Sequence, residues 1–547
     1  MTNILLMMRA VLVALCVPSL ILAQAPVTPI TAAEIDGYLR FLASDALEGR
    51  APGTRGGRLT VEYLASQLRA FGLRPGAGGS FTQDVPIDVV TANPATIAVT
   101  AAGRATARLR HPSEVVVWAG SAVPRSSARG ELVFAGYGAS APEFNWDDFK
   151  NVDLRGKILL VLVNDPPATP SEPNLFGGRA MTYYGRWTYK FEEAERRGAA
   201  GVLIVHTTEA AGYPWQTVTA SWATGQRMLP RPASQPAPLG ARGWITDGAA
   251  TVLLRSVGLD LAALTARAAR RDFRPVPTGI TIDIGFENSV ENLRSHNVIG
   301  IVPGSDPELR DEYVAFSAHW DHFGIGAPVD GDSIYNGAND NASGTADLLA
   351  IARAASQGRP ALKRSMIFVF VTAEESGLLG SKYFAEHPTV PITSIVANLN
   401  VDIGNLLGRT RDLRVLGDTK SSLGPAIEAM VRPLGMRLTP DAHPERGYFY
   451  RSDHFSFALA GIPAVSIAAG SDFVGKPAGW GAQQEEEWTS RRYHQPSDEY
   501  RPDFDLSGAM QLSEIVLQFG RQVANAPAMP TWNADAEFRR PAGPAKP

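Results

Sequence analysis

Three apolar stretches of the sequence are each followed by side chains that can bind a metal ion or move a proton. The stretches span residues 313–318, 366–372 and 395–401, and the side chains after them are His319, Asp321, Glu374, Glu375 and Asp402. Apolar runs of this length are typical of buried strands. Open α/β sheets bind ligands beyond the carboxyl ends of their strands. The sequence therefore predicts imidazole and carboxylate groups at one sheet edge, a donor set that suits divalent metal ions.

Two loops can add ligands to this edge. Residues 336–344 form a polar segment rich in small residues, and it places Asp340 just before a predicted helix. A second segment, far downstream, contains Tyr493 and His494. Each residue alone has an ordinary structural explanation, since an Asp-Asn pair among glycines usually forms a turn. The presence of all of them in one pattern favours a site.

Alternating strands and helices surround these residues. Strands are predicted at residues 297–302, 313–318, 366–372, 395–401 and 464–469, and helices at 344–355 and 422–434. This alternation predicts an α/β fold with a mixed sheet that helices flank on both faces. Near the N-terminus, Thr31 followed three residues later by Glu34 indicates a capped helix, and a second helix is expected over residues 58–71.

Residues 113–283 differ in character from the rest of the chain. Short strands are predicted at residues 131–135, 158–163 and 202–205, with a helix at 189–197 and few candidate catalytic side chains. We interpret this stretch as a β-rich insertion that divides the α/β domain into residues 26–112 and 284–525. The last segment, residues 526–547, is rich in Pro and Ala and is predicted to be a loose tail.

The first 25 residues have the layout of a secretory signal peptide. Residues 10–22 are largely apolar, and Ala23-Gln24-Ala25 supplies the small-x-small pattern of a cleavage site. The only cysteine, Cys16, lies in this segment, so the mature chain would have none. The sequence thus predicts an exported protein, periplasmic or secreted, and no later run is long enough to span a membrane.

The composition argues against one class of binding partner. The chain has 547 residues, of which 45% are hydrophobic, and a formal net charge of −4. Such a balance argues against a nucleic-acid partner. The oligomeric state is left open by the sequence.

The motifs resemble those of the co-catalytic dizinc peptidases, the family that includes secreted bacterial aminopeptidases, glutamate carboxypeptidase and the transferrin-receptor ectodomain. The segments that carry the resemblance are His319-x-Asp321, Gly337-x-Asn339-Asp340-Asn341-x-Ser343-Gly344, Glu374-Glu375-x-Gly377-Leu378-Leu379-Gly380-Ser381, Asn398-x-Asn400-x-Asp402 and Tyr493-His494-x-Pro496-x-Asp498. Their order and approximate spacing match the family. The β-rich insertion resembles the protease-associated domain that many members carry.

The resemblance implies two metal ions bridged by Asp340. One ion would also be held by His319 and Asp402, and the other by Glu375 and His494. The ligand types suit Zn²⁺, with Mn²⁺ or Co²⁺ as alternatives. The family often has a cis peptide after the bridging aspartate, which places it at Asp340-Asn341.

The same resemblance implies the catalytic roles. Asp321 would orient the ligand His319, Glu374 would be the general base for a metal-bridged hydroxide, and Tyr493 would hydrogen-bond the developing oxyanion. Of the remaining histidines, His322 either lines the site or faces solvent, and His454 is expected to be architectural or to line the pocket.

The leading hypothesis is an exported zinc aminopeptidase that removes N-terminal residues from peptides. A carboxypeptidase or dipeptidase of the same family is the first alternative, because the pocket cannot be aligned well enough to choose between them. A non-catalytic, receptor-like binding scaffold is disfavoured, since such proteins lose metal ligands and here all are present. The full set of five ligands also argues against a glutaminyl cyclase with one zinc.

Overall fold

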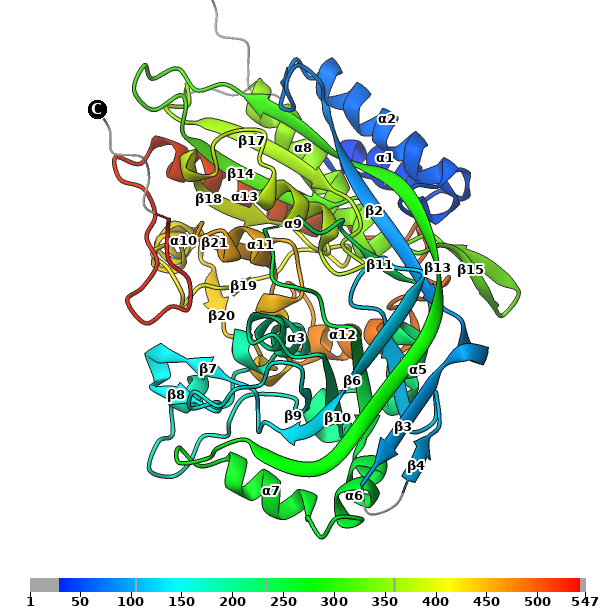
Figure 1. The fold of residues 1–547 in the computed structure, drawn as a ribbon. Helices are drawn as coiled ribbons and strands as arrows, with labels where there is room; N and C mark the ends of the chain where they lie inside the picture. Colours follow the sequence, from blue (N-terminus) through cyan, green and yellow to red (C-terminus); the bar gives the residue numbers. More distant parts are fainter. Residues whose placement is uncertain (1–28, 104–105, 233, 358–360, 542–547) are drawn as a thin grey trace, which may run out of the picture.

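Two β-sheets share one long strand in the computed structural model, which describes residues 29–103, 106–232, 234–357 and 361–541 (Figure 1). The strand is β13 (Val276–Val302), with 27 residues. The signal peptide predicted for residues 1–25 lies outside the described residues. Among the residues that are described, no helix has the length and apolar character needed to cross a membrane.

The first sheet contains the three apolar stretches that lead to the predicted ligands. Its strands, in spatial order, are β11 (Gln226–Met228), β2 (Thr82–Ala92), β13, β17 (Ser365–Val371), β14 (Tyr313–His319), β18 (Ile395–Asn400), β21 (Ala464–Ala469), β19 (Asp412–Leu416) and β20 (Arg437–Thr439), and the short β1 (Arg74–Pro75) pairs with β13. The central strands β17, β14, β18 and β21 are parallel, whereas β13 is antiparallel to β17. The predicted mixed sheet is confirmed.

Helices cover both faces of this sheet. One face packs against α1 (Ala32–Leu42), α2 (Arg55–Ala70), α8 (Gly344–Ser356), α10 (Leu423–Val431) and α13 (Ser507–Asn525), and the other against α9 (Leu379–Glu386) and α11 (His454–Leu459). α1 begins as predicted, because the Thr31 hydroxyl accepts a hydrogen bond from the Glu34 backbone N–H. The central strands are therefore buried on both sides, which explains their continuous apolar sequences.

The second sheet uses the first half of β13. Its strands, in spatial order, are β4 (Thr106–Leu109), β3 (Ala98–Ala102), β13, β6 (Arg125–Phe134), β9 (Ile158–Leu162), β10 (Gly201–His206), β12 (Ala241–Thr246) and β5 (Val115–Trp118). One face packs against α6 (Asp247–Arg255) and α7 (Leu261–Ala268), and the other against α3 (Trp187–Arg196) and α5 (Trp215–Trp222). We call this sheet with its helices the second unit.

The strand pairing differs from the predicted boundaries of the insertion. β3 and β4 precede residue 113, yet they belong to the second sheet. β13 also crosses the boundary predicted at residue 283 without a break. Alternating apolar residues predict a strand but say nothing about which sheet it joins, so these edges could not be seen in the sequence. The likeness of this unit to a protease-associated domain stays a prediction.

The prediction of a loose C-terminal tail is wrong for its described part, which ends at residue 541. Phe538 is buried, Glu537 forms an ion pair of 2.9 Å with Lys420, and the Trp532 indole donates to the Gly461 carbonyl. Buried aromatic surface outweighs the effect of the Pro and Ala content.

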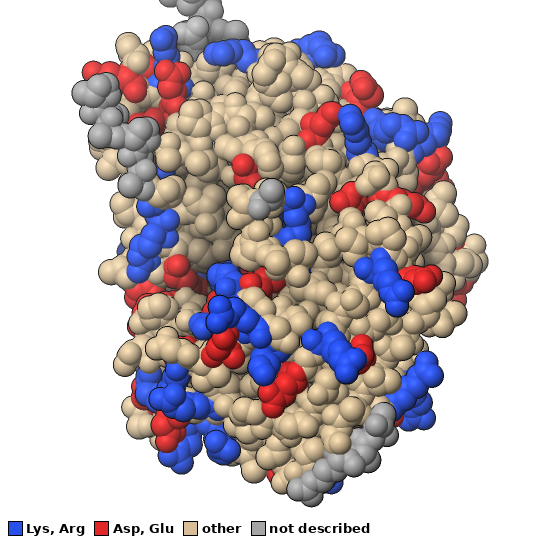
Figure 2. Space-filling view, in the orientation of Figure 1, with Lys and Arg blue, Asp and Glu red and all other residues tan. Residues whose placement is uncertain are grey.

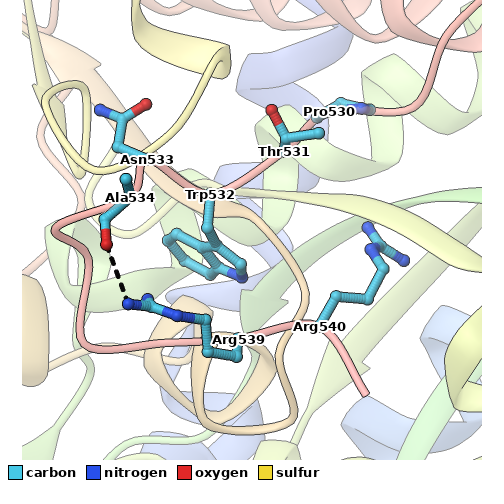
Figure 3. Close-up of a pocket in the computed structure, with 7 residues that line it drawn as sticks. All are labelled: Pro530, Thr531, Trp532, Asn533, Ala534, Arg539 and Arg540. Atoms are coloured by element: carbon cyan, nitrogen blue, oxygen red, sulfur yellow. Dashed lines mark hydrogen bonds between the residues drawn. The ribbon is translucent and has the colours of Figure 1, made fainter. Parts of the chain in front are cut away.

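A cavity of about 280 Å³ lies within this tail (Figure 3). Its arginines are already bound to main-chain carbonyls: Arg539 donates to Ala534, and Arg540 donates to Ile395 and Val396. Ile395 begins β18, whereas Asp402 follows the end of that strand. The cavity therefore lies at the opposite end of β18 from the predicted ligands.

Candidate metal centre

The structure brings the five predicted ligands together at the carboxyl edge of the first sheet. His319 Nε2 lies 3.3 Å from Asp340 Oδ1 and 3.3 Å from Asp402 Oδ1. His494 Nε2 lies 3.4 Å from Asp340 Oδ2 and 3.3 Å from Glu375 Oε2. The two oxygens of Asp340 thus face different histidines, and each histidine is paired with one further carboxylate.

These separations fit ligands that share a metal ion. Two ligand atoms bound to one tetrahedral Zn²⁺ at about 2.0–2.1 Å lie about 3.3–3.4 Å from each other. His494 Nε2 is buried and has no hydrogen-bond partner among the described residues, as a nitrogen reserved for a metal would be. The donor set, imidazole nitrogen with carboxylate oxygen, therefore suits divalent cations.

The main chain adopts unusual conformations at three of the ligand positions. Ala373, just before Glu374, has a φ of +54°, Ile403, just after Asp402, has a φ of +69°, and His494 itself has a φ of +60°. Residues other than glycine rarely have positive φ, and such positions gather at functional sites. At each of these three positions the chain changes direction next to a side chain that faces the candidate metal centre.

Asp498 holds the loop that carries Asp340 through hydrogen bonds to its main chain. The Asp498 carboxylate accepts hydrogen bonds from the backbone N–H of Asn339 at 3.1 Å and of Asp340 at 3.0 Å. The peptide between Asp340 and Asn341 is cis, as expected. The Asn341 side-chain oxygen then accepts from the N–H of Gly344 and Ile403, which ties this loop to the one that carries Asp402.

Arg50 holds the same region from the other side, a role that the sequence did not reveal. Its buried guanidinium donates to the carbonyls of Trp320 at 2.9 Å and Gly337 at 3.0 Å, and to two more main-chain carbonyls. Trp320 lies between His319 and Asp321, and Gly337 precedes Asp340. The only hint in the sequence was the segment Leu47-Glu48-Gly49-Arg50, which interrupts the helical pattern between the two predicted N-terminal helices.

The site carries more negative than positive charge. Burial and the neighbouring Glu375 and Asp402 carboxylates hold the pKa of Glu374 well above its ordinary value. Burial also opposes the ionisation of Asp340, but the His319 and His494 imidazoles outweigh it and hold the pKa of Asp340 well below its usual range. A surplus of buried carboxylate charge favours the binding of cations.

Asp321 contacts His319 differently from the expectation. His319 Nδ1 lies 3.2 Å from the Asp321 backbone carbonyl oxygen and 3.8 Å from the nearer carboxylate oxygen. The carboxylate instead accepts a hydrogen bond of 3.2 Å from the Glu374 backbone N–H. Asp321 therefore touches His319 through its main chain and the predicted general base through its side chain.

The Tyr493 ring lies against the ring of His494, a predicted ligand. Its ring centre lies 3.6 Å from that of His494, and the Trp488 ring lies at 5.3 Å on the same segment. Burial and the Asp340 carboxylate hold the pKa of Tyr493 well above its ordinary value, so the phenol keeps its proton at neutral pH. A protonated phenol can donate a hydrogen bond, and its predicted contact with an oxyanion stays a prediction.

His322 is the site residue that sequence reasoning left undecided. It is buried, and its Nδ1 lies 2.6 Å from Glu375 Oε1, so both oxygens of that carboxylate face a histidine. Its position three residues after His319, at the end of the same strand, was the available signal. His454 is buried beside the Phe449 ring, in line with an architectural role.

The chain is similar to several known proteins. The family model described as "Peptidase family M28" matches residues 297–520. The chain is 28% identical over 214 residues to a probable leucine aminopeptidase 2 of Aspergillus oryzae, covering 37% of this chain and 40% of that protein. It is 26% identical over 328 residues to the mouse aminopeptidase NAALADL1, covering 51% and 39%. The matches thus span about two fifths of these relatives.

The chain is also similar to a solved structure. The aminopeptidase from Aneurinibacillus sp. strain AM-1 aligns over 94% of this chain and 98% of its own, with 21% sequence identity and a TM-score of 0.48.

Proposed function

Residues 297–520 form a domain of peptidase family M28, and from that premise we propose that this protein is an exported zinc-dependent exopeptidase, most plainly an aminopeptidase. The proposed site residues are Glu374, Asp321 and Tyr493 as catalytic or positioning groups and His319, Asp340, Glu375, Asp402 and His494 as ligands of two Zn²⁺. Mn²⁺ or Co²⁺ in their place is the alternative that the ligand types allow. Both relatives described above are named as aminopeptidases, which supports this activity.

One observation carries the proposal. The two oxygens of Asp340 face His319 and His494 at 3.3 and 3.4 Å, so a single carboxylate joins two sets of donors. A lone structural carboxylate would instead be satisfied by main-chain or side-chain N–H groups on one side. When bound, the two ions would polarise the scissile carbonyl and lower the pKa of the attacking water.

The chain's own residues supply the rest of the chemistry. Glu374, held through its N–H by Asp321, takes a proton from the attacking water and gives it to the leaving amine. Tyr493, protonated, donates a hydrogen bond to the substrate oxygen as negative charge develops there.

The test is release of p-nitroaniline from aminoacyl p-nitroanilides. Each free-amine substrate is paired with its N-acetylated form and assayed before chelation, after chelation and after return of zinc. Cleavage of the free-amine member alone, lost with the chelator and restored by zinc, is expected. A protein that binds two zinc ions but cleaves none of these substrates would overturn the aminopeptidase assignment and direct the search to peptides with free carboxyl ends. Export is tested separately by N-terminal sequencing of the mature protein.

A further inference from the structure

A β-hairpin over residues 324–335 begins directly beside the candidate metal centre. The residue two positions before it is His322, whose Nδ1 lies 2.6 Å from Glu375 Oε1. The centre of the Phe323 ring, next in the chain, lies 4.7 Å from that of His494 and 4.9 Å from that of His322. Phe323 is nevertheless 40% exposed. Its ring therefore contacts a predicted ligand and is still open to a molecule bound at the centre.

Apolar side chains continue from Phe323 along the first strand of the hairpin, β15 (Gly324–Val329). Ile325 is 64% exposed and Val329 is 40% exposed, and no residue between Phe323 and Val329 carries a charge. Figure 1 shows the hairpin projecting from the body of the protein, and Figure 2, in the same orientation, shows mostly uncharged surface at that edge. Exposed apolar groups gathered in this way are typical of binding surfaces.

The strand pairing gives the hairpin two different faces. β15 pairs with β16 (Asp332–Tyr335), with Gly324 opposite Tyr335 and Ile325 opposite Ile334. Residues opposite each other in an antiparallel pair share a face, and neighbours along a strand alternate between the faces. Gly324 and Tyr335 therefore lie on one face, and the apolar pair of Ile325 and Ile334 lies on the other.

The face with Gly324 is packed against the rest of the protein. Gly324 is buried, and a Cβ at this position would lie 2.6 Å from the Cβ of Ala51. A Cβ at Gly49 would likewise lie 2.7 Å from the Gly324 carbonyl oxygen, so both glycines permit a close approach that other residues would block. The hairpin is thus held in place through one face, whereas Ile325, on the other face, stays exposed.

The position of the hairpin identifies the part of a substrate that reaches it. An exopeptidase holds the terminal residue of a peptide at its catalytic centre, and the rest of the peptide must extend toward solvent. Phe323 joins the two regions, because its ring contacts His494 and the exposed apolar run begins there. An extended peptide advances about 3.3 Å per residue, so a substrate that passes His494 lays its next residues along Phe323 and Ile325. Apolar side chains bind such a surface because both leave water.

We propose that the hairpin binds apolar side chains on the leaving-group side of the scissile bond, so that the enzyme selects peptides with a large apolar residue in the second or third position. Phe323 contacts the second residue of the substrate, and Ile325 and Val329 contact the residues beyond it. This inference rests on the proposed function and names its substrate class.

Pairs of peptide amides that differ in one side chain test the inference. Leucyl-leucine amide is compared with leucyl-serine amide, and leucyl-glycyl-leucine amide with leucyl-glycyl-serine amide, all on the zinc-loaded protein. A kcat/KM about 5- to 20-fold higher for the apolar member of at least one pair is expected, since the leucine side chain is partly buried on the hairpin. Every substrate keeps the same N-terminal leucine, so the ratio reports on the leaving-group side alone. Equal rates within both pairs would overturn the inference.

The variants are compared as ratios within each pair, so that a general loss of activity cancels. I325S and V329S should each lower the ratio, and F323S should bring it close to one for the dipeptide amides. F323L keeps an apolar side chain beside His494 and should retain most of the ratio. V252S is the matched control, because Val252 is 70% exposed on α6 of the second unit, and its ratio should equal that of the wild type. A ratio that survives in the double variant F323S/I325S would overturn the inference.

Binding separates this inference from the proposed function. Calorimetric titration of zinc-loaded E374Q with leucyl-leucine amide and with leucyl-serine amide gives a Kd ratio that requires no turnover. Absence of hydrolysis in the wild type would overturn the proposed exopeptidase, while tighter binding of the apolar amide that F323S weakens would still support the binding surface. Equal Kd values would overturn the surface even in an active enzyme.

Sedimentation velocity and vesicle binding test other occupants of the same face. The wild type and I325S should have the same oligomeric state, and neither should bind phosphatidylcholine vesicles. A wild-type dimer that I325S dissociates would assign the face to a second copy of the chain, and vesicle binding lost in I325S would assign it to a membrane. Either result would overturn the inference.

Discussion

Lys190 and Asp148 of the second unit differ from several groups at the candidate metal centre in how their buried polar atoms are satisfied. In the second unit, Lys190 is buried and its Nζ donates to three main-chain carbonyls at 2.5 to 3.0 Å. Asp148 accepts from the Ala139 N–H and the Trp146 indole. At the candidate metal centre, by contrast, His494 Nε2, His322 Nε2 and one oxygen of Asp321 are buried with no hydrogen-bond partner among the described residues.

This difference distinguishes buried groups that stabilise the fold from buried groups that can bind a ligand. A buried charge whose full hydrogen-bonding capacity is used by the chain contributes to the fold, because it has nothing left to offer a ligand. A buried polar atom without a partner costs free energy, which an absent ion or substrate can recover. The predictions below change one group at a time in each region, and the second unit serves as the reference.

The largest effect is expected for Asp340→Ala, because Asp340 faces both sets of donors. The variant should bind neither zinc ion tightly and should show no chelator-sensitive activity. The wild type at a free zinc concentration 1,000 times its Kd should gain about 4 kcal/mol of stability, and this gain should vanish in the variant. Elemental analysis and thermal unfolding with and without zinc measure both. D283A, a change at an exposed ion pair of the second unit, should behave as the wild type. Two tightly bound ions in D340A would contradict the bridging role.

Glu374→Gln should separate catalysis from metal binding at the same edge of the sheet. Loss of a general base typically costs about 10²- to 10⁴-fold in rate, and kcat should fall by that amount while both zinc ions remain. The control is E386Q at the exposed end of α9, which should keep full activity. Activity of E374Q near that of the wild type would remove Glu374 from the mechanism.

Much of the candidate site could be predicted because it follows long apolar strands. Residues 313–318, 366–372 and 395–401 are buried on both faces, so the sequence marks where they end, and the ligands lie there. The contacts of Arg50 with Trp320 and Gly337 had no such marker. They join segments that are far apart in the sequence, and no local pattern encodes such a contact. The boundaries of the second sheet were hidden for the same reason, since β13 continues from one sheet into the other.

A change at Lys190 should lower the free energy of unfolding and leave zinc binding unchanged. Lys190→Met removes the donor to three buried carbonyls, and the loss of a fully bonded buried charge typically costs about 3–5 kcal/mol. Urea unfolding should measure this loss, whereas zinc content should equal that of the wild type. K382M, at an exposed lysine of α9, should change the free energy of unfolding by no more than about 0.5 kcal/mol. A variant that loses zinc along with stability would show that the two regions are coupled.

The smallest effect tests whether Asp148 belongs to the fold alone. Burial raises the pKa of Asp148 from its ordinary value of 3.8 to about 6, against the opposing hydrogen bonds from Ala139 and Trp146. A carboxyl with a raised pKa binds its proton more tightly in the folded state. Its contribution to stability is therefore fully present below about pH 4 and is lost as the pH rises through about 6. The difference amounts to about 3 kcal/mol at most.

The measurement uses zinc-free protein, because loss of zinc as the metal ligands are protonated in acid would also change the stability. The contribution of Asp148 can then be measured alone. The free energy of unfolding of wild type minus that of D148N should become more positive by up to about 3 kcal/mol as the pH falls from 7 to 4. D283N, at an exposed position, supplies the baseline for ordinary carboxylates. A difference that stays constant across this range would mean that the pKa of Asp148 is the same in the folded and unfolded states, as for a freely solvated carboxyl. Its two hydrogen bonds would then not be those of a buried carboxylate, and the second unit could not serve as the satisfied counterpart of the metal centre.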